Sequence, residues 1–339
     1  MNACVVGGGI IGALTAHALA QKGLKVQVLD AGRPGAATPA SAGILFSIFD
    51  RTGDSVWANL ARYGHAAYPE LCAGIESETG FERRGLLVVG METRQAAEWA
   101  SAQGLGCETL SPSECRQRFP QLAAPEHNVA LLPEVAQIEP RRFMETFRSR
   151  LQDEGVHWES AEVSRILRDQ EDRARGVSDG VREWQAERVV IAAGAWSAGL
   201  QEDAGSKPSV RPRRGQVVAW RSVETQGLPI VLDGHRYLVA RKDGEMLAGA
   251  TDEDVGFDVG LTEEARAELT GFARHWCPDL LAAEPDVQRA GLRPEGDISG
   301  PRIGAHDRIR GLFFNTGHYR HGIVCAPGAA AQLAECCHL

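Results

Sequence analysis

Several features that define other classes of protein are missing from this 339-residue chain. No run of about 18 apolar residues occurs, which is the length of a membrane-spanning helix, so we expect no integral membrane segment. Residues 4–19 are apolar, but no basic segment precedes them and glycines recur within them, which disfavours a secretory signal. Lys and Arg number 36 against 45 Asp and Glu, a net charge of −9 that disfavours a nucleic-acid partner. We therefore expect a cytoplasmic protein.

The eight cysteines form no C-x-x-C pair. In a chain of this length, scattered cysteines are typical of free thiols in a reducing compartment and not of a disulfide framework. Cys336 and Cys337 are adjacent, and we expect no special role for them, with a redox role as the alternative. The chain has no internal repeat or low-complexity linker, and its length suffices for two domains or for one domain with a large insertion.

The first thirty residues have the order strand, turn, helix, strand. Residues 2–6 form a short apolar run, residues 13–21 are rich in helix formers, and residues 26–29 predict a second strand that ends at Asp30. Gly23 lies where the C-terminus of a helix favours glycine. This order is the context in which a glycine-rich turn predicts a dinucleotide-binding site.

The turn carries the pattern G-x-G-x-x-G at Gly7, Gly9 and Gly12. In such a turn the first glycine permits the tight bend, the second lets the backbone approach a pyrophosphate, and the third lets helix and strand pack closely. The N-terminus of the helix would face the phosphates, and Asp30 would accept hydrogen bonds from ribose hydroxyls. The alternative is a glycine-rich turn without a ligand.

Hydrophobic periodicity predicts the remaining elements of an α/β protein. We expect helices at residues 57–78, 141–154 and 262–275, helix and loop at 92–122, and a closing helix after Gly322 with Pro327 in its first turn. Strands are expected at residues 86–89, 129–132, 136–138, 156–167, 184–191, 216–221, 237–240, 246–250 and 311–315. Elements that suit one nucleotide-binding sheet occur at the start, middle and end of the chain. We therefore predict two interleaved domains, one of residues 1–80, 139–211 and 288–339 that binds a cofactor and one of residues 81–138 and 212–287 that binds a substrate.

Two arginines lie in short glycine-bounded segments near the C-terminus, Arg293 in residues 290–294 and Arg320 in residues 317–323. We expect both in turns, although Pro294 favours extended backbone at Arg293. Arginine is the side chain best shaped to bind a carboxylate through two parallel hydrogen bonds. Together with the dinucleotide unit, these arginines predict a redox enzyme that acts on a small carboxylic acid. The alternative places them on the surface.

Five segments together resemble the FAD-dependent D-amino-acid oxidase family and, within it, the glycine oxidase branch linked to thiamine biosynthesis. The segments are the glycine fingerprint of residues 7–12, Ala-Ser-Ala-Gly at 40–43, Val-Val-Ile-Ala-Ala-Gly-Ala-Trp-Ser at 189–197, Ala-Gly-Leu-Arg-Pro at 290–294 and Gly-His-Tyr-Arg-His-Gly-Ile at 317–323. The resemblance spans nearly the whole chain. It implies a glutathione-reductase-like FAD-binding domain interleaved with a mixed-sheet α+β substrate domain. FAD would be bound non-covalently, because the relatives with covalent flavin have a cysteine near the position of Arg293 and this chain does not.

The resemblance also implies roles for individual residues. Arg293 matches the family's carboxylate clamp, Tyr237 its hydroxyl partner, and Arg320 a second active-site arginine near the flavin; plain sheet packing is the alternative for Tyr237. The residues that would hold FAD are Gly7, Gly9, Ile10, Ile11, Gly12, Asp30, Ala31, Ser41, Ala42, Gly43, Val163, Ala193, Gly194, Trp196, Gly317, His318, Arg320, His321, Gly322 and Ile323. His318 and His321 lie three positions apart, but without a third ligand nearby hydrogen bonding around the flavin is favoured over a metal site.

The implied reaction moves a hydride from the Cα of glycine, or of a small or N-substituted glycine, to flavin N5. The imine would then hydrolyse to glyoxylate and an amine, and molecular oxygen would become hydrogen peroxide. Members of the family are often homo-oligomers. The alternatives are an oxidase of a specialised N-alkylated glycine, a D-amino-acid dehydrogenase that passes electrons to a quinone, and a non-catalytic flavin-binding redox sensor.

Two segments depart from the family pattern. After residues 249–251 some relatives carry an apolar residue, whereas this chain has Asp-Glu-Asp at residues 252–254. These acidic groups either favour a substrate with extra amine character or lie outside the pocket. Residues 46–57, which border the substrate entrance in relatives, lack the aromatic and proline pattern of the thiamine-linked members. Both departures leave the identity of the preferred substrate open.

Overall fold

The computed structural model describes residues 2–47, 55–205, 210–297 and 299–337. A six-stranded sheet, in the order β18-β19-β12-β1-β2-β8, takes strands from the start, middle and end of the chain. Five strands are parallel and β18 is an antiparallel edge. The strands are β1 (Asn2–Val6), β2 (Lys25–Asp30), β8 (His157–Ser160), β12 (Arg188–Ile191), β18 (Arg302–Ala305) and β19 (Leu312–Thr316). Strands such as β12 and β19 are buried along their whole length because both faces of the sheet are covered.

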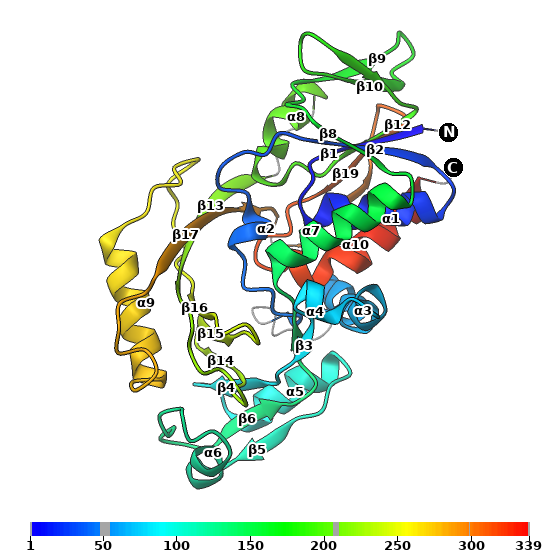
Figure 1. Ribbon diagram of the computed structural model, residues 1–339. Coiled ribbons are helices and arrows are strands. Elements are labelled where there is room, and N and C mark those ends of the chain that lie inside the picture. The colour runs from blue at the N-terminus through cyan, green and yellow to red at the C-terminus, as the bar shows by residue number, and fades with distance from the viewer. Residues whose placement is uncertain (1, 48–54, 206–209, 298, 338–339) are drawn as a thin grey trace.

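Helices cover one face of this sheet and a small sheet covers the other. On the first face α1 (Ile10–Gln21), α7 (Pro140–Asp153) and α10 (Gly322–Cys336) lie side by side (Figure 1) and share one hydrophobic cluster. On the second face a three-stranded sheet packs together with α8 (Ser197–Asp203); its strands are β9 (Arg165–Arg168), β10 (Ala174–Ser178) and β11 (Glu183–Gln185). The predicted strand–helix–strand order of the first thirty residues is confirmed.

Helix α3 (Val56–Leu71) contacts the closing helix α10 where Pro327 interrupts the helical hydrogen bonds. Pro327 lies inside α10, not in its first turn as the sequence analysis expects. A proline has no N–H, so the carbonyl of Ile323, four residues earlier, loses its helical donor. The hydroxyl of the fully buried Tyr68 on α3 donates to this carbonyl at 2.6 Å. A Cβ added at Gly64 would lie 1.7 Å from the Val324 oxygen, so the two helices approach at backbone distance.

The second large sheet is mixed and has eight strands in the order β17-β13-β16-β15-β14-β4-β6-β5. They are β4 (Leu86–Val89), β5 (Glu108–Leu110), β6 (Val129–Leu132), β13 (Arg211–Trp220), β14 (Ile230–Asp233), β15 (Arg236–Ala240), β16 (Met246–Gly249) and β17 (Val287–Glu295). Helix α9 (Glu263–Trp276) packs on one face through Leu269 and Trp276, and α5 (Thr93–Ala102) packs on the other through Trp99. Short elements complete the chain: α2 (Ala37–Ala40), α4 (Glu76–Thr79), α6 (Pro112–Arg118), the 3-10 turn η1 (Gly194–Trp196) and the paired strands β3 (Glu82–Arg83) and β7 (Ala136–Gln137).

The strands β13 and β17 form a long antiparallel ribbon, paired from Ala219 opposite Val287 to Arg211 opposite Glu295. In Figure 1 this ribbon runs from the eight-stranded sheet toward the six-stranded sheet. Arg293 lies within β17, so the expectation that it occupies a turn is wrong; Pro294 does extend the backbone there.

Several boundaries differ from those expected. The helix expected over residues 57–78 is α3 and α4, separated at Gly74, whose φ of 78° is incompatible with a continuous helix. The strands expected at 156–167 and 184–191 are each divided in two, and β5 lies in a region expected to be helix and loop. The domain limits remain a proposal; β17 belongs to the eight-stranded sheet although the proposed limit assigns residue 288 onward to the cofactor-binding domain. In the described part of the chain no helix is both long and apolar enough to cross a membrane.

Candidate active site

A cavity of about 680 Å³ is bounded by residues from both large sheets. Most of the residues predicted from the sequence line it: Gly7, Gly9, Ile10, Ile11, Asp30, Ala31, Ser41, Ala42, Gly43, Val163, Ala193, Gly194, Trp196, Tyr237, Arg293, His318, Arg320, Gly322 and Ile323. Gly12, Gly317 and His321 are outside this lining. The structure therefore brings segments from the start, middle and end of the chain to one cavity.

In the β1–α1 turn, glycines allow neighbouring backbone segments to lie in close contact. Gly7 has φ 106°, and a Cβ there would lie 2.4 Å from the Ala192 oxygen. A Cβ at Gly12 would lie 1.9 Å from the Gly7 oxygen, so Gly12 sets the distance between turn and helix without lining the cavity. The N-cap residue of α1 is Gly9, which has no side chain, and the first turn of α1 has no acidic residue, so the positive end of the helix can face an anion.

Two polar side chains fix this turn. Asp30 accepts hydrogen bonds from the backbone N–H groups of Gly8 and Gly32, so its carboxylate holds the turn as well as facing the cavity. Thr38 Oγ1 accepts from the N–H of Ile10 at 3.2 Å. Thr38 is not among the predicted site residues; its place in the small-residue loop after the second strand is the signal that could have identified it.

The two histidines have different surroundings. His318 is 1% exposed and lines the cavity, and among the described residues neither of its ring nitrogens has a hydrogen-bond partner. Burial lowers the pKa of His318 to about 3, so its ring is neutral near pH 7. His321 Nδ1 is 2.9 Å from Ser47 Oγ, and its ring stacks on Trp57 at 4.6 Å. Within the described ranges no group of three His, Cys, Asp or Glu side chains could hold a metal ion.

On the eight-stranded sheet, two glycines leave room for the predicted substrate-binding side chains. A Cβ at Gly215 would lie 2.1 to 2.5 Å from the Arg293 guanidinium, and one at Gly249 would lie 2.7 Å from Tyr237 Oη. Arg293 Nη1 donates to the backbone carbonyl oxygen of Thr251 at 2.9 Å. Burial lowers the pKa of Arg293 and raises that of Tyr237, while their mutual interaction opposes both shifts. Gly215 and Gly249 gave no signal in the sequence that would distinguish them from other strand glycines.

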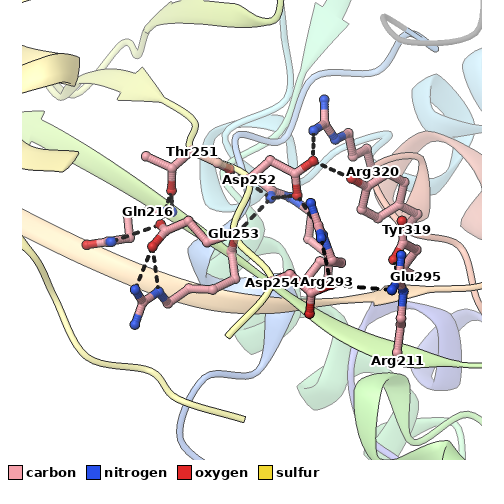
Figure 2. Close-up of polar contacts among 12 residues, drawn as sticks. Arg211, Gln216, Thr251, Asp252, Glu253, Asp254, Arg293, Glu295, Tyr319 and Arg320 are labelled. Atoms are coloured by element: carbon pink, nitrogen blue, oxygen red, sulfur yellow. Dashed lines mark hydrogen bonds and ion pairs between the residues drawn. The ribbon is translucent and has the colours of Figure 1, made fainter. Parts of the chain in front are cut away.

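The acidic triplet of residues 252–254 lies among arginines (Figure 2). Tyr319 Oη donates to Asp252 Oδ2 at 2.6 Å, Arg213 Nε donates to Oδ1 at 3.2 Å, and Arg320 contacts Oδ2. Burial alone would raise the pKa of Asp252, but the hydrogen bonds from Tyr319 and Arg213 and the charge of Arg320 lower it to about 2. Asp252 is therefore an ionised part of the arginine cluster.

The backbone brings Arg320 beside Arg293. Tyr319 has φ 47°, in the left-handed region, and its N–H donates to the Pro294 oxygen at 2.9 Å. A Cβ at Gly296 would lie 2.7 Å from the Gly317 oxygen, so the end of β17 and the turn before α10 are in backbone contact. This contact joins the two sheets at the cavity.

A parallel nucleotide-binding sheet with a glycine turn, and two partly buried arginines, Arg293 and Arg320, that line the same cavity, define a dinucleotide-dependent oxidoreductase. The model of the DAO family, described as FAD dependent oxidoreductase, matches residues 2–336, and the chain belongs to this family. The resemblance to the D-amino-acid oxidase family and the expectation of FAD are thereby confirmed.

Similar proteins include the glycine oxidase of Pseudomonas aeruginosa, 33% identical over 98% of this chain and 93% of that protein. The hydrogen cyanide synthase subunit HcnC of the same organism is 30% identical over 98% of this chain and 91% of its own. Among solved structures, Bacillus cereus glycine oxidase has a TM-score of 0.88 at 26% identity, and iminodiacetate oxidase from Chelativorans sp. BNC1 has 0.87 at 28%. Each structure covers 98% of this chain and 94% of its own, which confirms the predicted α/β fold.

The residues present fit FAD. Gly7 and Gly9 have no side chains, so the backbone of the turn is accessible from the cavity. The N-terminus of α1 suits a diphosphate, and the small residues 40–43 leave space in the same cavity. His318 offers ring nitrogens that have no described partner of their own. A bound flavin would supply the partner that a buried polar group requires.

Proposed function

We propose that this protein oxidises the Cα–N bond of glycine or of a small N-substituted glycine, with non-covalent FAD and molecular oxygen. The observation that carries the proposal is the Arg293 guanidinium, which fits the space left by Gly215 and lines the same cavity as the dinucleotide turn. The Arg293 side chain is 16% exposed, and a guanidinium in such a cavity is suited to a carboxylate. Among the described residues that line the cavity there is no cysteine, which supports non-covalent flavin.

Each residue of the site has a separate task in the proposal. FAD, when bound, accepts a hydride from the substrate and passes electrons to oxygen, giving hydrogen peroxide. Arg293 binds the substrate carboxylate, and Tyr237, whose buried hydroxyl stays protonated because its pKa is raised, donates a hydrogen bond to it. Together they orient Cα toward the cofactor. The neutral ring of His318 accepts or donates a hydrogen bond at the cofactor without adding charge.

The relatives support an amine as the substrate without fixing which one. Two similar proteins are named glycine oxidases, and one is named an iminodiacetate oxidase. All three names describe oxidation of glycine or of a glycine with a substituent on nitrogen. An amino group next to a carboxylate is the feature common to these substrates, and in this proposal Arg293 binds the carboxylate of that pair.

The test mixes the flavin-loaded protein with glycine, sarcosine or D-alanine without oxygen, and then admits air. Loss of the oxidised-flavin absorbance followed by peroxide is the expected result. Bleaching that recovers slowly in air would favour a dehydrogenase, and no bleaching with any of these amines would contradict the proposal. Arg293→Ala should retain FAD and weaken substrate binding about tenfold or more, because a charge-assisted hydrogen bond is lost. Arg221→Ala, at an exposed arginine, is the matched control.

A further inference from the structure

A buried arginine joins the eight-stranded sheet to the small-residue loop at residues 40–43. Arg241 follows β15, is 4% exposed, and is not among the described residues that line the cavity. Its Nη2 donates to the backbone carbonyl oxygen of Ala42 at 3.0 Å, and its Nη1 donates to that of Ile138 at 2.8 Å. Ala42 and Gly43 both line the cavity. One guanidinium therefore contacts this loop from behind the cavity wall.

The turn that carries Arg241 is fixed by hydrogen bonds of its own. The Arg241 N–H donates to the carbonyl oxygen of Glu245 at 2.9 Å, and the Arg241 carbonyl accepts from Thr225 Oγ1 at 2.6 Å. Gln137 Nε2 donates to the Ala240 carbonyl at 2.6 Å, so the two segments are joined in both directions. The guanidinium keeps its charge when buried and is thus a strong donor held in one place.

Arg241 replaces a backbone donor that a regular sheet would supply. A short antiparallel bridge pairs Ile44 with Gln137. Beside this bridge, the Ile138 N–H donates to the Gly43 carbonyl oxygen at 3.0 Å. In a regular antiparallel pair the Gly43 N–H would donate back to the Ile138 carbonyl. Here that carbonyl accepts from Arg241, and among the residues that the structure describes none accepts from the Gly43 N–H.

The backbone of Gly43 explains this exchange of donors. Its φ of 79° lies in the left-handed region, and a Cβ there would lie 2.0 Å from the Ile138 oxygen, so the position requires glycine. A trans peptide is planar, and its C=O and N–H point in opposite directions. Because the Ala42 carbonyl points to Arg241, the Gly43 N–H of the same peptide points away from Arg241. A buried N–H requires an acceptor, and the cavity that Gly43 lines has space for one.

The course of the loop indicates which half of FAD would meet this N–H. The loop starts beside the dinucleotide turn, where Thr38 Oγ1 accepts from the Ile10 N–H. It ends at Ala42, which belongs to the same hydrophobic cluster as Tyr237. With its diphosphate at the turn, FAD would place the adenine half toward Asp30 and the flavin half along this loop. The flavin ring offers nitrogen and carbonyl acceptors to a backbone donor.

We propose that Arg241 is a positioning residue for the cofactor: it binds the carbonyl oxygens of Ala42 and Ile138, and so directs the Gly43 N–H to the flavin half of FAD. Arg241 acts through this peptide and not by contact with the cofactor. The inference concerns cofactor binding and does not depend on which amine the protein oxidises. When the guanidinium is removed, the Ile138 carbonyl loses its donor and the Gly43 N–H turns back toward it. The flavin half then loses one hydrogen bond, whereas the adenine half keeps its contacts.

Binding of two ligands to the protein freed of FAD tests this inference. FAD contains both halves of the cofactor, and ADP contains only the adenine half with its diphosphate. Arg241→Met, which keeps an unbranched side chain without donors, should raise the Kd of FAD about tenfold, the size of one hydrogen bond, and leave the Kd of ADP unchanged by titration calorimetry. Arg289→Met is the matched control and should change neither Kd. Arg289 pairs with Glu245 in the same region and does not donate to the loop.

Arg241→Lys serves as the second variant if Arg241→Met does not fold. It keeps the charge but lacks the planar fork that reaches both carbonyls, so it should also raise the Kd of FAD and not that of ADP. Equal losses of FAD and ADP affinity would show a general structural role and overturn the inference. An unchanged Kd of FAD in the Arg241 variants, or a loss confined to FAD in Arg289→Met, would overturn it as well. A protein that binds FAD but oxidises no amine contradicts the proposed function instead, and the two dissociation constants still decide the role of Arg241.

Discussion

A single methyl group added at Gly215 would test whether the position of Arg293 determines substrate binding. The Cβ of Gly215→Ala would lie 2.1 Å from Nη2, 2.3 Å from Cζ and 2.5 Å from Nη1 of Arg293. Unbonded heavy atoms of this kind prefer separations of about 3.5 Å, so the guanidinium has to move by roughly 1 Å or more. The displaced atoms belong to the end of a flexible side chain, so the strand itself can remain in place.

The magnitude follows from what the displaced guanidinium loses. Hydrogen bonds to a charged group contribute about 1.5–3 kcal/mol, which corresponds to roughly a 10- to 150-fold change in affinity. We therefore expect Gly215→Ala to raise the KM for glycine or sarcosine by about this factor. FAD content and the melting temperature should change little, because the dinucleotide turn is untouched and alanine restricts the unfolded chain more than glycine does.

The assay is initial peroxide formation against substrate concentration, with FAD content read from the absorbance of the purified protein. Gly271→Ala is the control, because a Cβ at this position of α9 meets nothing within 4 Å. A KM equal to that of the wild type in a Gly215→Ala protein that retains FAD would refute the reasoning, since it would mean that Arg293 does not hold the carboxylate from its present position.

Two further predictions concern stability. Tyr68→Phe removes the donor to the buried Ile323 carbonyl in α10 and should lower the free energy of unfolding, measured by urea denaturation, by about 1–3 kcal/mol. Tyr63→Phe, at a position that is 53% exposed, should leave the free energy of unfolding unchanged. Equal losses in the two variants would contradict this prediction. The pKa of His318 is lowered to about 3, so between pH 6.5 and about 3 the unfolded chain binds a proton that the folded chain does not, and stability falls as the pH falls. His318→Asn should reduce this pH dependence between pH 7 and 5, and identical slopes in the two proteins would refute the assignment.

Local signals predicted much of the fold. Strand β1 and the strands at residues 86–89 and 129–132 have the expected limits, because short apolar runs bounded by turns identify buried strands. The first helix begins three residues before the expected residue 13, since the glycine-rich turn already has helical backbone there. Strand β5 was missed because its polar residues form an edge strand that depends on pairing with β6.

The candidate site was predicted less completely, because its contacts join segments far apart in the sequence. Arg293 and Arg320 are predicted from their glycine-bounded segments and Tyr237 through the resemblance, and all three line the cavity. The partnership of Arg320 with Asp252 depends on the register of β13 and β17 and on the turn before α10, which no local pattern encodes. The role of Gly215, which leaves space for the Arg293 guanidinium, can likewise be recognised only from the structure.

The interleaved sheet has a consequence for the order in which the protein is made. Helix α1 buries its apolar residues against α10, and β12 lies between β1 and β19, so the first nucleotide-binding unit is completed by a strand and a helix that are made long after it. Until residues 312–336 emerge, the apolar surface of the N-terminal unit lacks its final cover, and exposed apolar surface of this kind is prone to aggregation. Such long-range pairing also makes folding slow. The glycine turn near residue 7 thus becomes a complete cofactor site only after residues 312–336 have been made.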